Sequence, residues 1–272
     1  MRRAAPALIA LCLLAACADD EAELIDDDRP PEAIFAEGER LMREGDWLEA
    51  AQRFDDVERL YPYSDTAKDA MLRAAQAYYQ AESYNEARLA AERFLRFHPA
   101  DPRAAEAQYL IANSWYAQIV DVGRDQSATR EALAALRDTV NRYPGTEEAR
   151  SAQLKLDLTL DHLAGKEMQV GRYYLKRGHY IAAINRFRAV IETYQTTSHT
   201  PEALHRLVEA YMALGVPAEA QTAAAVLGYN FPGSKWYAAS FDLLTGSDLA
   251  PLENSDSWIS RAYRQVIQGE WL

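Results

Sequence analysis

The stretch Gly45-Asp46-Trp47-Leu48-Glu49-Ala50, followed by Phe54 and Pro62, sets a pattern that the rest of the chain repeats. Parts of it return four more times, each around a small residue equivalent to Ala50. In four of the five units a proline lies 12 residues after this alanine, and Gln195 takes its place in the fourth. The equivalent alanines are Ala50, Ala87, Ala132, Ala183 and Ala220.

This pattern is typical of paired helices that pack closely. A small residue lets two helices approach, and a large residue four positions on (Phe54, Leu136 or Phe187) fills the space between neighbours. Proline ends the second helix because it cannot donate to the helical hydrogen-bond ladder. The pattern resembles the tetratricopeptide repeat. We therefore expect an all-α fold, a right-handed superhelical solenoid of five helix pairs plus a C-terminal capping helix.

The spacing of the units departs from the ideal repeat twice. An insertion around residues 119–127 predicts a loop between the helices of the third pair. Residues 147–177 are nearly free of helix breakers, so we expect one long helix, or two nearly collinear helices that meet near Gly165. A last segment, residues 257–272, has apolar side chains at roughly helical spacing and is expected to cap the solenoid.

The N-terminus has the plan of a secretory signal, with Arg2 and Arg3 followed by a short apolar run. The box Leu14-Ala15-Ala16-Cys17 resembles that of bacterial lipoproteins, which implies cleavage before Cys17 and its acylation. The alternative is an ordinary signal peptide with an incidental cysteine. In proteobacterial lipoproteins aspartate after the acylated cysteine favours the inner membrane; Ala18 stands here, so the resemblance favours the outer membrane.

Composition narrows the classes of function. The chain has a net charge of −12, and without residues 1–16 it has 27 basic and 41 acidic side chains, which argues against binding to nucleic acid. Cys17 would then be the only cysteine, so no disulfide is expected. We find no motif of a catalytic site, and we expect no enzyme activity, cofactor or metal. The five histidines are expected on turns or solvated helix faces: His98, His162, His179, His199 and His205.

The first helices of units 1–3 supply candidate binding residues. The resemblance to tetratricopeptide proteins places four positions of each such helix in a peptide-binding groove, where polar and aromatic side chains contact an extended peptide. The alternative is that these are ordinary solvated positions. The candidates are Phe35, Met42, Leu72, Gln76, Tyr79, Tyr109, Asn113 and Tyr116, interspersed with Glu32, Glu39, Asp69 and Glu106.

Motifs between the units carry a closer resemblance. They are Tyr61-Pro62-Tyr63-Ser64, residues 94–102, residues 121–126, Arg142-Tyr143-Pro144 and, most specifically, residues 161–178. Over about residues 32–240 the chain resembles the BamD family, the outer-membrane lipoproteins of the β-barrel assembly machinery. The insertion is shorter than in the best-known members, Gln195 replaces an expected proline, and the tail after Tyr237 has no match.

The resemblance implies a scaffold on the periplasmic face of the outer membrane, attached through its lipid anchor only. Units 1–3 would bind the C-terminal targeting strand of unfolded outer-membrane β-barrel clients in their groove. Units 4–5 would dock the membrane-proximal POTRA domain of a BamA-type barrel subunit. Other lipoproteins of the complex are expected as further partners. The alternative is a lipoprotein pilotin, or another adaptor for a secretin or envelope complex; a lytic enzyme would need a further catalytic domain.

These expectations divide the chain into five parts. They are a signal peptide at 1–16, an acidic tether from acylated Cys17 at 17–31, the client-binding units 1–3 at 32–145, the long connecting helix with units 4–5 at 146–240, and a tail or cap at 241–272.

Overall fold

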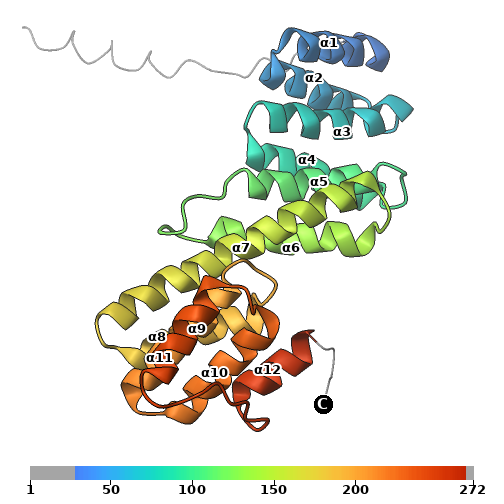
Figure 1. Ribbon diagram of the computed structural model, residues 1–272. Coiled ribbons are helices and arrows are strands. Elements are labelled where there is room, and N and C mark those ends of the chain that lie inside the picture. Colours follow the sequence, from blue (N-terminus) through green and yellow to red (C-terminus); the bar gives the residue numbers. More distant parts are fainter. Residues whose placement is uncertain (1–27, 268–272) are drawn as a thin grey trace, which may run out of the picture.

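The computed structural model describes residues 28–267, and all regular elements in this range are helices (Figure 1). The expected signal peptide, Cys17 and most of the tether lie outside the described residues. The helices are α1 (Pro31–Glu44), α2 (Trp47–Leu60), α3 (Asp65–Gln80), α4 (Tyr84–Phe97), α5 (Ala104–Tyr116), α6 (Ser127–Arg142), α7 (Glu147–Lys176), α8 (Tyr180–Thr193), α9 (Thr200–Leu214), α10 (Pro217–Asn230), α11 (Lys235–Thr245) and α12 (Trp258–Ile267).

Neighbouring helices pack in sequence, which confirms the solenoid of helix pairs. Units 1–5 are α1/α2, α3/α4, α5/α6, α7/α8 and α9/α10. The five alanines of the repeat are all fully buried, as close helix packing requires. The glycines before three of them have the left-handed φ that opens each turn: Gly45, Gly178 and Gly215, at +89°, +76° and +73°.

Proline is less necessary for ending the second helix than the repeat pattern suggests. Helices α2, α4, α6 and α10 each end two residues before a proline. Helix α8 ends at the equivalent residue, Thr193, although Gln195 stands where the proline is expected. The Tyr194 N–H donates to the Val190 carbonyl at 2.9 Å, and the backbone leaves the helical conformation at Tyr194, where φ is −127° and ψ is 30°.

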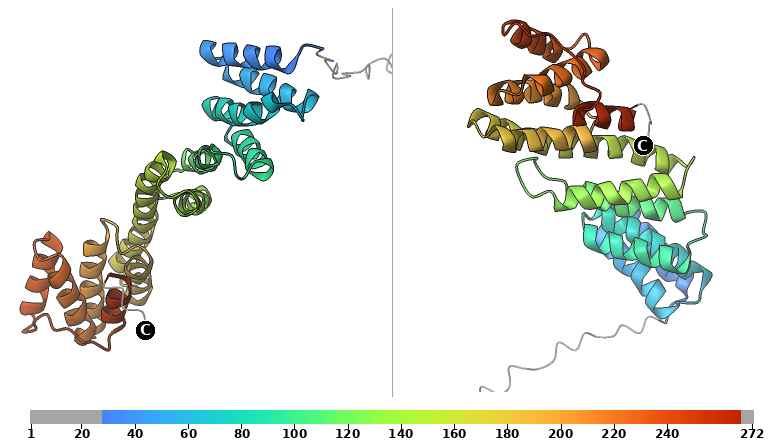
Figure 2. Two further views of the ribbon diagram at one scale, coloured as in Figure 1. Left: turned by 90° about the vertical axis from the view of Figure 1, so that its right-hand side faces the viewer. Right: turned by 90° about the horizontal axis from the view of Figure 1, so that it is seen from below.

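The long segment forms one helix, α7, of 30 residues. Its first half packs on α5 and α6, where Leu156 belongs to a core that extends back to Ile34. Its second half packs on α8 and α9, where Ala164 and Met168 belong to a second core. Figure 2 shows the helices of units 1–3 and of units 4–5 as two groups at either end of α7. One uninterrupted helix therefore joins two separate cores.

Two of the units contain the same close approach between a glycine and a phenylalanine. A Cβ added to Gly38 in α1 would lie 2.7 Å from the Phe54 ring, and one added to Gly171 in α7 would lie 2.4 Å from the Phe187 ring. Both rings are fully buried. In unit 2 the fully buried ring is that of Phe94, three residues beyond the position the repeat pattern points to.

The C-terminal region has one helix more than expected. Helix α11 packs on α9 and α10 and continues the stack, so it runs through residue 240, where the sequence places the start of the tail. Helix α12 lies against α8 and α10. The Trp258 indole N–H donates to the Tyr211 hydroxyl at 2.9 Å and fixes α12 in place. The expected capping segment thus forms a helix, although its last five residues lie outside the described range.

The helices in residues 28–267 lack a segment that combines the length and the apolar character needed to cross a bilayer.

Candidate functional site

The A-helix face of units 1–3 is the surface formed by α1, α3, α5 and the first half of α7, which contact one another in this order. Most of the predicted binding residues are half-buried here, with part of each side chain packed on the core. Phe35 packs its ring 5.2 Å from that of Phe54. The half-buried candidates are Phe35, Met42, Gln76, Tyr79, Tyr109 and Tyr116.

Two predicted binding residues are not available as proposed. Leu72 is only 2% exposed and belongs to the core of units 1–3, so it cannot contact a peptide on the surface. Asn113 is 8% exposed, and its Oδ1 accepts a hydrogen bond from Lys155. The register of an ideal repeat misplaces Leu72, because this position of α3 lies in the core between the helices, whereas Gln76 and Tyr79 of the same helix stay half-buried.

Hydrogen bonds connect the polar side chains of α1, α3 and α5 on this face. Arg73 donates to both carboxylate oxygens of Glu39 at 2.5 Å and to the Gln76 amide oxygen at 2.8 Å. The Gln76 amide N–H donates in turn to Glu106. Since both ends of the Gln76 amide are used, this chain of bonds stabilises the stacking of α1, α3 and α5 more than it offers free partners to a ligand.

Asp101, in the turn between α4 and α5, positions a cation on this face. Its carboxylate accepts hydrogen bonds from the Arg103 side chain and backbone N–H and lies 3.3 Å from Lys68 Nζ. Arg103 also pairs with Asp69, another predicted position, at 2.8 Å. The Arg103 side chain and Lys68 outweigh desolvation and hold the pKa of the Asp101 carboxyl well below its usual range.

Asp101→Asn should lower the free energy of unfolding by about 1–2 kcal/mol at pH 7, because it removes the charge from a buried hydrogen-bonded carboxylate. A depressed pKa in the folded state stabilises the protein above the ordinary pKa of aspartate, and this stabilisation is lost as the pH falls. The difference between the variant and the wild type should therefore shrink below about pH 4, where the unfolded carboxyl takes up its proton. Urea unfolding at pH 7 and pH 3 measures it; an equal difference at both pH values would contradict the assignment.

Lys155 is a residue of this face that the sequence analysis missed. Its Nζ lies 5.1 Å from the centre of the Tyr109 ring and 5.2 Å from that of Tyr116, and it donates to Asn113 Oδ1 at 2.5 Å. Lys155 comes from α7, 42 residues beyond Asn113. The sequence carries no local signal for it, because the contact depends on how α7 stacks on α5.

The insertion between α5 and α6 forms a loop over residues 117–126, as expected, and it contacts the second half of α7. Lys166 Nζ donates to the Gly123 carbonyl at 3.2 Å. A Cβ on Gly165 would lie 3.7 Å from the Val122 side chain and 3.2 Å from His199 Nε2. Glycine at position 165 therefore allows the insertion and the loop before α9 to meet on α7.

Asp161 in α7 accepts hydrogen bonds from the loop before α9. Its Oδ1 accepts hydrogen bonds from the Ser198 N–H at 3.0 Å and hydroxyl at 2.7 Å. The motifs at 121–126 and 161–178, far apart in sequence, thus meet at the junction of units 1–3 with units 4–5.

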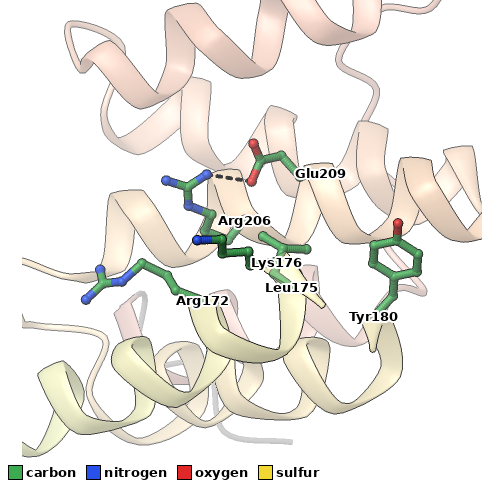
Figure 3. Close-up of a pocket in the computed structure, with 6 residues that line it drawn as sticks. All are labelled: Arg172, Leu175, Lys176, Tyr180, Arg206 and Glu209. Carbon is green, nitrogen blue, oxygen red and sulfur yellow. Dashed lines mark hydrogen bonds and ion pairs between the residues drawn. The ribbon is translucent and has the colours of Figure 1, made fainter. Parts of the chain in front are cut away.

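Units 4–5 carry a charged cavity of about 390 Å³ between α7, α8 and α9 (Figure 3). Arg206 donates to Glu209 at 2.7 Å. Burial raises the pKa of Glu209, but hydrogen bonds from His205 and Arg206 outweigh it and leave that pKa below the usual range. The cavity is lined by Arg172, Leu175, Lys176, Tyr180, Arg206 and Glu209.

A second, more apolar cavity of about 590 Å³ lies at the turn between α7 and α8. Ile181 and Leu214 line it beside Tyr174 and Tyr180. Ile181 is 68% exposed and adds an apolar side chain to the surface of this cavity.

One histidine differs from the expectation. His205 is buried, and its Nδ1 lies 2.8 Å from the Ser240 hydroxyl, so it packs within units 4–5 and not on a solvated face. Within residues 28–267, His, Cys, Asp and Glu side chains form no group of three that could hold a metal ion.

Comparison with known proteins gives consistent similarities. A family model described as "Outer membrane lipoprotein" (YfiO) matches residues 27–227. A Caulobacter vibrioides protein named outer membrane protein assembly factor BamD is 51% identical over 84% of this chain and 75% of its own length. Proteins of the same name from Rickettsia prowazekii and Neisseria meningitidis serogroup A are 42% and 35% identical, over 79% and 81% of this chain and 86% and 88% of their own lengths.

Proposed function

The chain belongs to the BamD family of outer membrane protein assembly factors, and from this premise we propose that it holds an unfolded client and the barrel subunit on two separate surfaces. The family places it at the outer membrane and in the Bam assembly complex. The observation that carries the proposal is α7, a single helix that contributes side chains to two cores and so connects them. The two surfaces can then work together without contacting each other.

The client would bind on the A-helix face of units 1–3. Half-buried rings of Phe35, Tyr79, Tyr109 and Tyr116 supply apolar contact area with little loss of side-chain entropy, and backbone groups of an extended strand can pair with the polar side chains between them. An unfolded barrel strand has this character, because its side chains alternate between apolar and polar.

The barrel subunit, a BamA-type protein, would dock through its POTRA domain on units 4–5. The apolar cavity lined by Ile181 and Leu214 supports this, since an exposed apolar patch marks an interaction site. Other lipoproteins of the complex would bind elsewhere on the chain. The role is that of a scaffold and not of an enzyme.

Acylation of Cys17 would keep both events at the periplasmic face of the outer membrane. Several acyl chains on one residue give durable anchoring, whereas one chain alone is marginal. Tethering raises the effective concentration of a docked client near the barrel to about the millimolar range, so each contact can be weak.

Ile181→Glu tests the docking surface. A buried unpaired carboxylate is costly, so we expect at least about tenfold weaker binding of the purified barrel subunit to the full-length protein in detergent, measured by biolayer interferometry. Leu48→Glu, an equally drastic change at an exposed residue of unit 1, is the matched control and should bind normally. Normal binding by the Ile181 variant would remove this cavity from the interface.

The proposed function itself is tested by adding the two partners in turn to the immobilised full-length protein. If the surfaces are separate, a client held in dilute urea and the barrel subunit bind at the same time, and neither displaces the other. Mutual displacement, or the absence of binding by either partner, contradicts the proposal.

A further inference from the structure

The charged cavity of units 4–5 concentrates positive charge in an acidic chain (Figure 3). Three cations line it, Arg172, Lys176 and Arg206, against a single carboxylate, that of Glu209. The chain as a whole has a net charge of −12. A local excess of positive charge draws anions to this cavity, whereas an acidic surface elsewhere repels them.

Lys176 is not neutralised by the protein. Among residues 28–267, no carboxylate lies within 4.0 Å of its Nζ, and the Nζ makes no hydrogen bond. Glu202 is shared by Arg172 at 3.0 Å and Arg206 at 3.3 Å, and Glu209 pairs with Arg206 at 2.7 Å. Two carboxylates therefore balance two of the three cations, and the charge of Lys176 is left over.

The two arginines also keep donors that the carboxylates do not use. Arg172 donates to Glu202 through Nη1, and Arg206 donates through Nε and Nη1. In the part of the chain that the structure describes, the Nη2 group of neither arginine has a hydrogen-bond partner. Because ion pairs already hold both guanidinium groups in place, a ligand bound here would lose little affinity to the ordering of these side chains.

We propose that Arg172, Lys176 and Arg206 bind a terminal phosphate group, that of a lipid headgroup or of free inorganic phosphate. This site is additional to the two surfaces of the proposed function. Arg172 and Lys176 come from α7 and Arg206 from α9, so the donors enter the cavity from two helices. A terminal phosphate has three acceptor oxygens and nearly two negative charges, so it offers one oxygen to each cation. A carboxylate has only two oxygens and one charge.

The rest of the cavity suits a molecule that carries the phosphate. Its volume of about 390 Å³ exceeds that of a phosphate ion, and Leu175 and Tyr180 line the remaining wall. Figure 3 shows Tyr180 across the cavity from Arg172. Arg206 also lies 5.3 Å from the centre of the Trp236 ring. Aromatic side chains beside cations are typical where a protein meets lipid headgroups.

The location of the chain favours a lipid as the source of the phosphate. The family places it at the outer membrane, where headgroups that carry phosphate are present. The net charge of −12 opposes broad adhesion to an anionic bilayer, so one cationic cavity would hold one headgroup. This contact would orient units 4–5 relative to the membrane. An anchor at Cys17 alone would not do so, since it is joined to unit 1 at the other end of the chain.

The experiment follows the tryptophan fluorescence of the full-length protein in a non-ionic detergent at constant ionic strength. Inorganic phosphate should change the signal with saturation at about millimolar concentration, a modest affinity for a small anion. Acetate, a carboxylate, should bind at least about tenfold more weakly. Trp236→Phe should remove most of the change, because the Trp236 ring lies beside Arg206.

The variants assign binding to the cavity. Lys176→Met removes the unpaired charge from an exposed side chain, so it should weaken phosphate binding at least about tenfold without unfolding the protein. Lys176→Arg should keep most of the affinity. Arg43→Met, an equal loss of charge at an exposed residue in the last turn of α1, is the matched control and should bind as the wild type.

Two short-chain lipids distinguish the sources of the phosphate. Dihexanoylphosphatidic acid ends in a free phosphate, whereas dihexanoylphosphatidylcholine has the same chains but a phosphate capped by choline. Binding of the acid about tenfold more tightly than inorganic phosphate would assign the site to a lipid headgroup, and equal affinities would assign it to phosphate itself. The choline lipid should leave the fluorescence unchanged.

Four outcomes would overturn the inference: no saturable response to phosphate or to the phosphatidic acid, equal binding of acetate and phosphate, equal phosphate binding by the wild type and Lys176→Met, or equal binding of the two lipids. In the last case the acyl chains and not the phosphate would be recognised. Each of these results leaves the proposed function as it stands, because neither the client nor the barrel subunit is present.

Discussion

Phe187→Ala should destabilise units 4–5 by about 3–5 kcal/mol, the usual cost of removing a buried aromatic ring. The ring is fully buried and packs directly on the bare backbone of Gly171, so no neighbouring side chain from that position can move in to fill the cavity. The effect should be local, because units 1–3 have a core of their own. Hydrogen exchange should accelerate strongly in α8–α10 and little in α1–α4.

Phe54→Ala is the matched control in the other core. Phe54 packs on Gly38 as Phe187 packs on Gly171, so the same change should accelerate exchange in α1–α3 and leave α9 and α10 protected. If either variant accelerates exchange equally along the whole chain, the two cores unfold as one unit and α7 does not separate them.

Cys17→Ala should release the protein from the membrane almost completely. Each buried methylene of an acyl chain contributes about 0.8 kcal/mol to membrane affinity, and the chains on Cys17 would be the whole anchor. Fractionation of cell envelopes, followed by immunoblotting, measures the distribution between the membrane and the soluble periplasmic fraction.

Cys12→Ala is the control for this experiment. Cys12 lies within the expected signal peptide, so its replacement should leave the protein on the membrane. If Cys17→Ala stays membrane-bound, or if the wild type is already soluble, Cys17 is not the anchor and the leader is an ordinary signal peptide.

The sequence predicts the helix pairs well because the repeat constrains packing. A small residue at positions such as Ala50 or Ala183 is required wherever two helices come close, and this requirement is visible in the pattern. The partly buried tyrosines Tyr78, Tyr174 and Tyr211 also pack against the cores. Helix α11 was missed because its segment lacks the repeat pattern, although Ser234 accepts a hydrogen bond from the Tyr237 N–H in the manner of a helix N-cap.

The candidate site is predicted less completely. The position of a residue within the repeat identifies which residues lie on the A-helix face. It cannot show that Leu72 packs inward, or that both the oxygen and the nitrogen of the Gln76 side-chain amide are hydrogen-bonded. It also cannot find Lys155, since this side chain reaches Asn113 from a different unit. Contacts between units depend on the angle at which they stack, and this angle is not encoded in any single repeat.

The scaffold role is tested most directly by mass spectrometry of the proteins that co-purify with the tagged full-length chain from detergent-solubilised envelopes. We expect a POTRA-bearing barrel protein in near-stoichiometric amount, and a selective loss of this protein with Ile181→Glu. Recovery of a secretin, or of no barrel protein at all, would contradict this role.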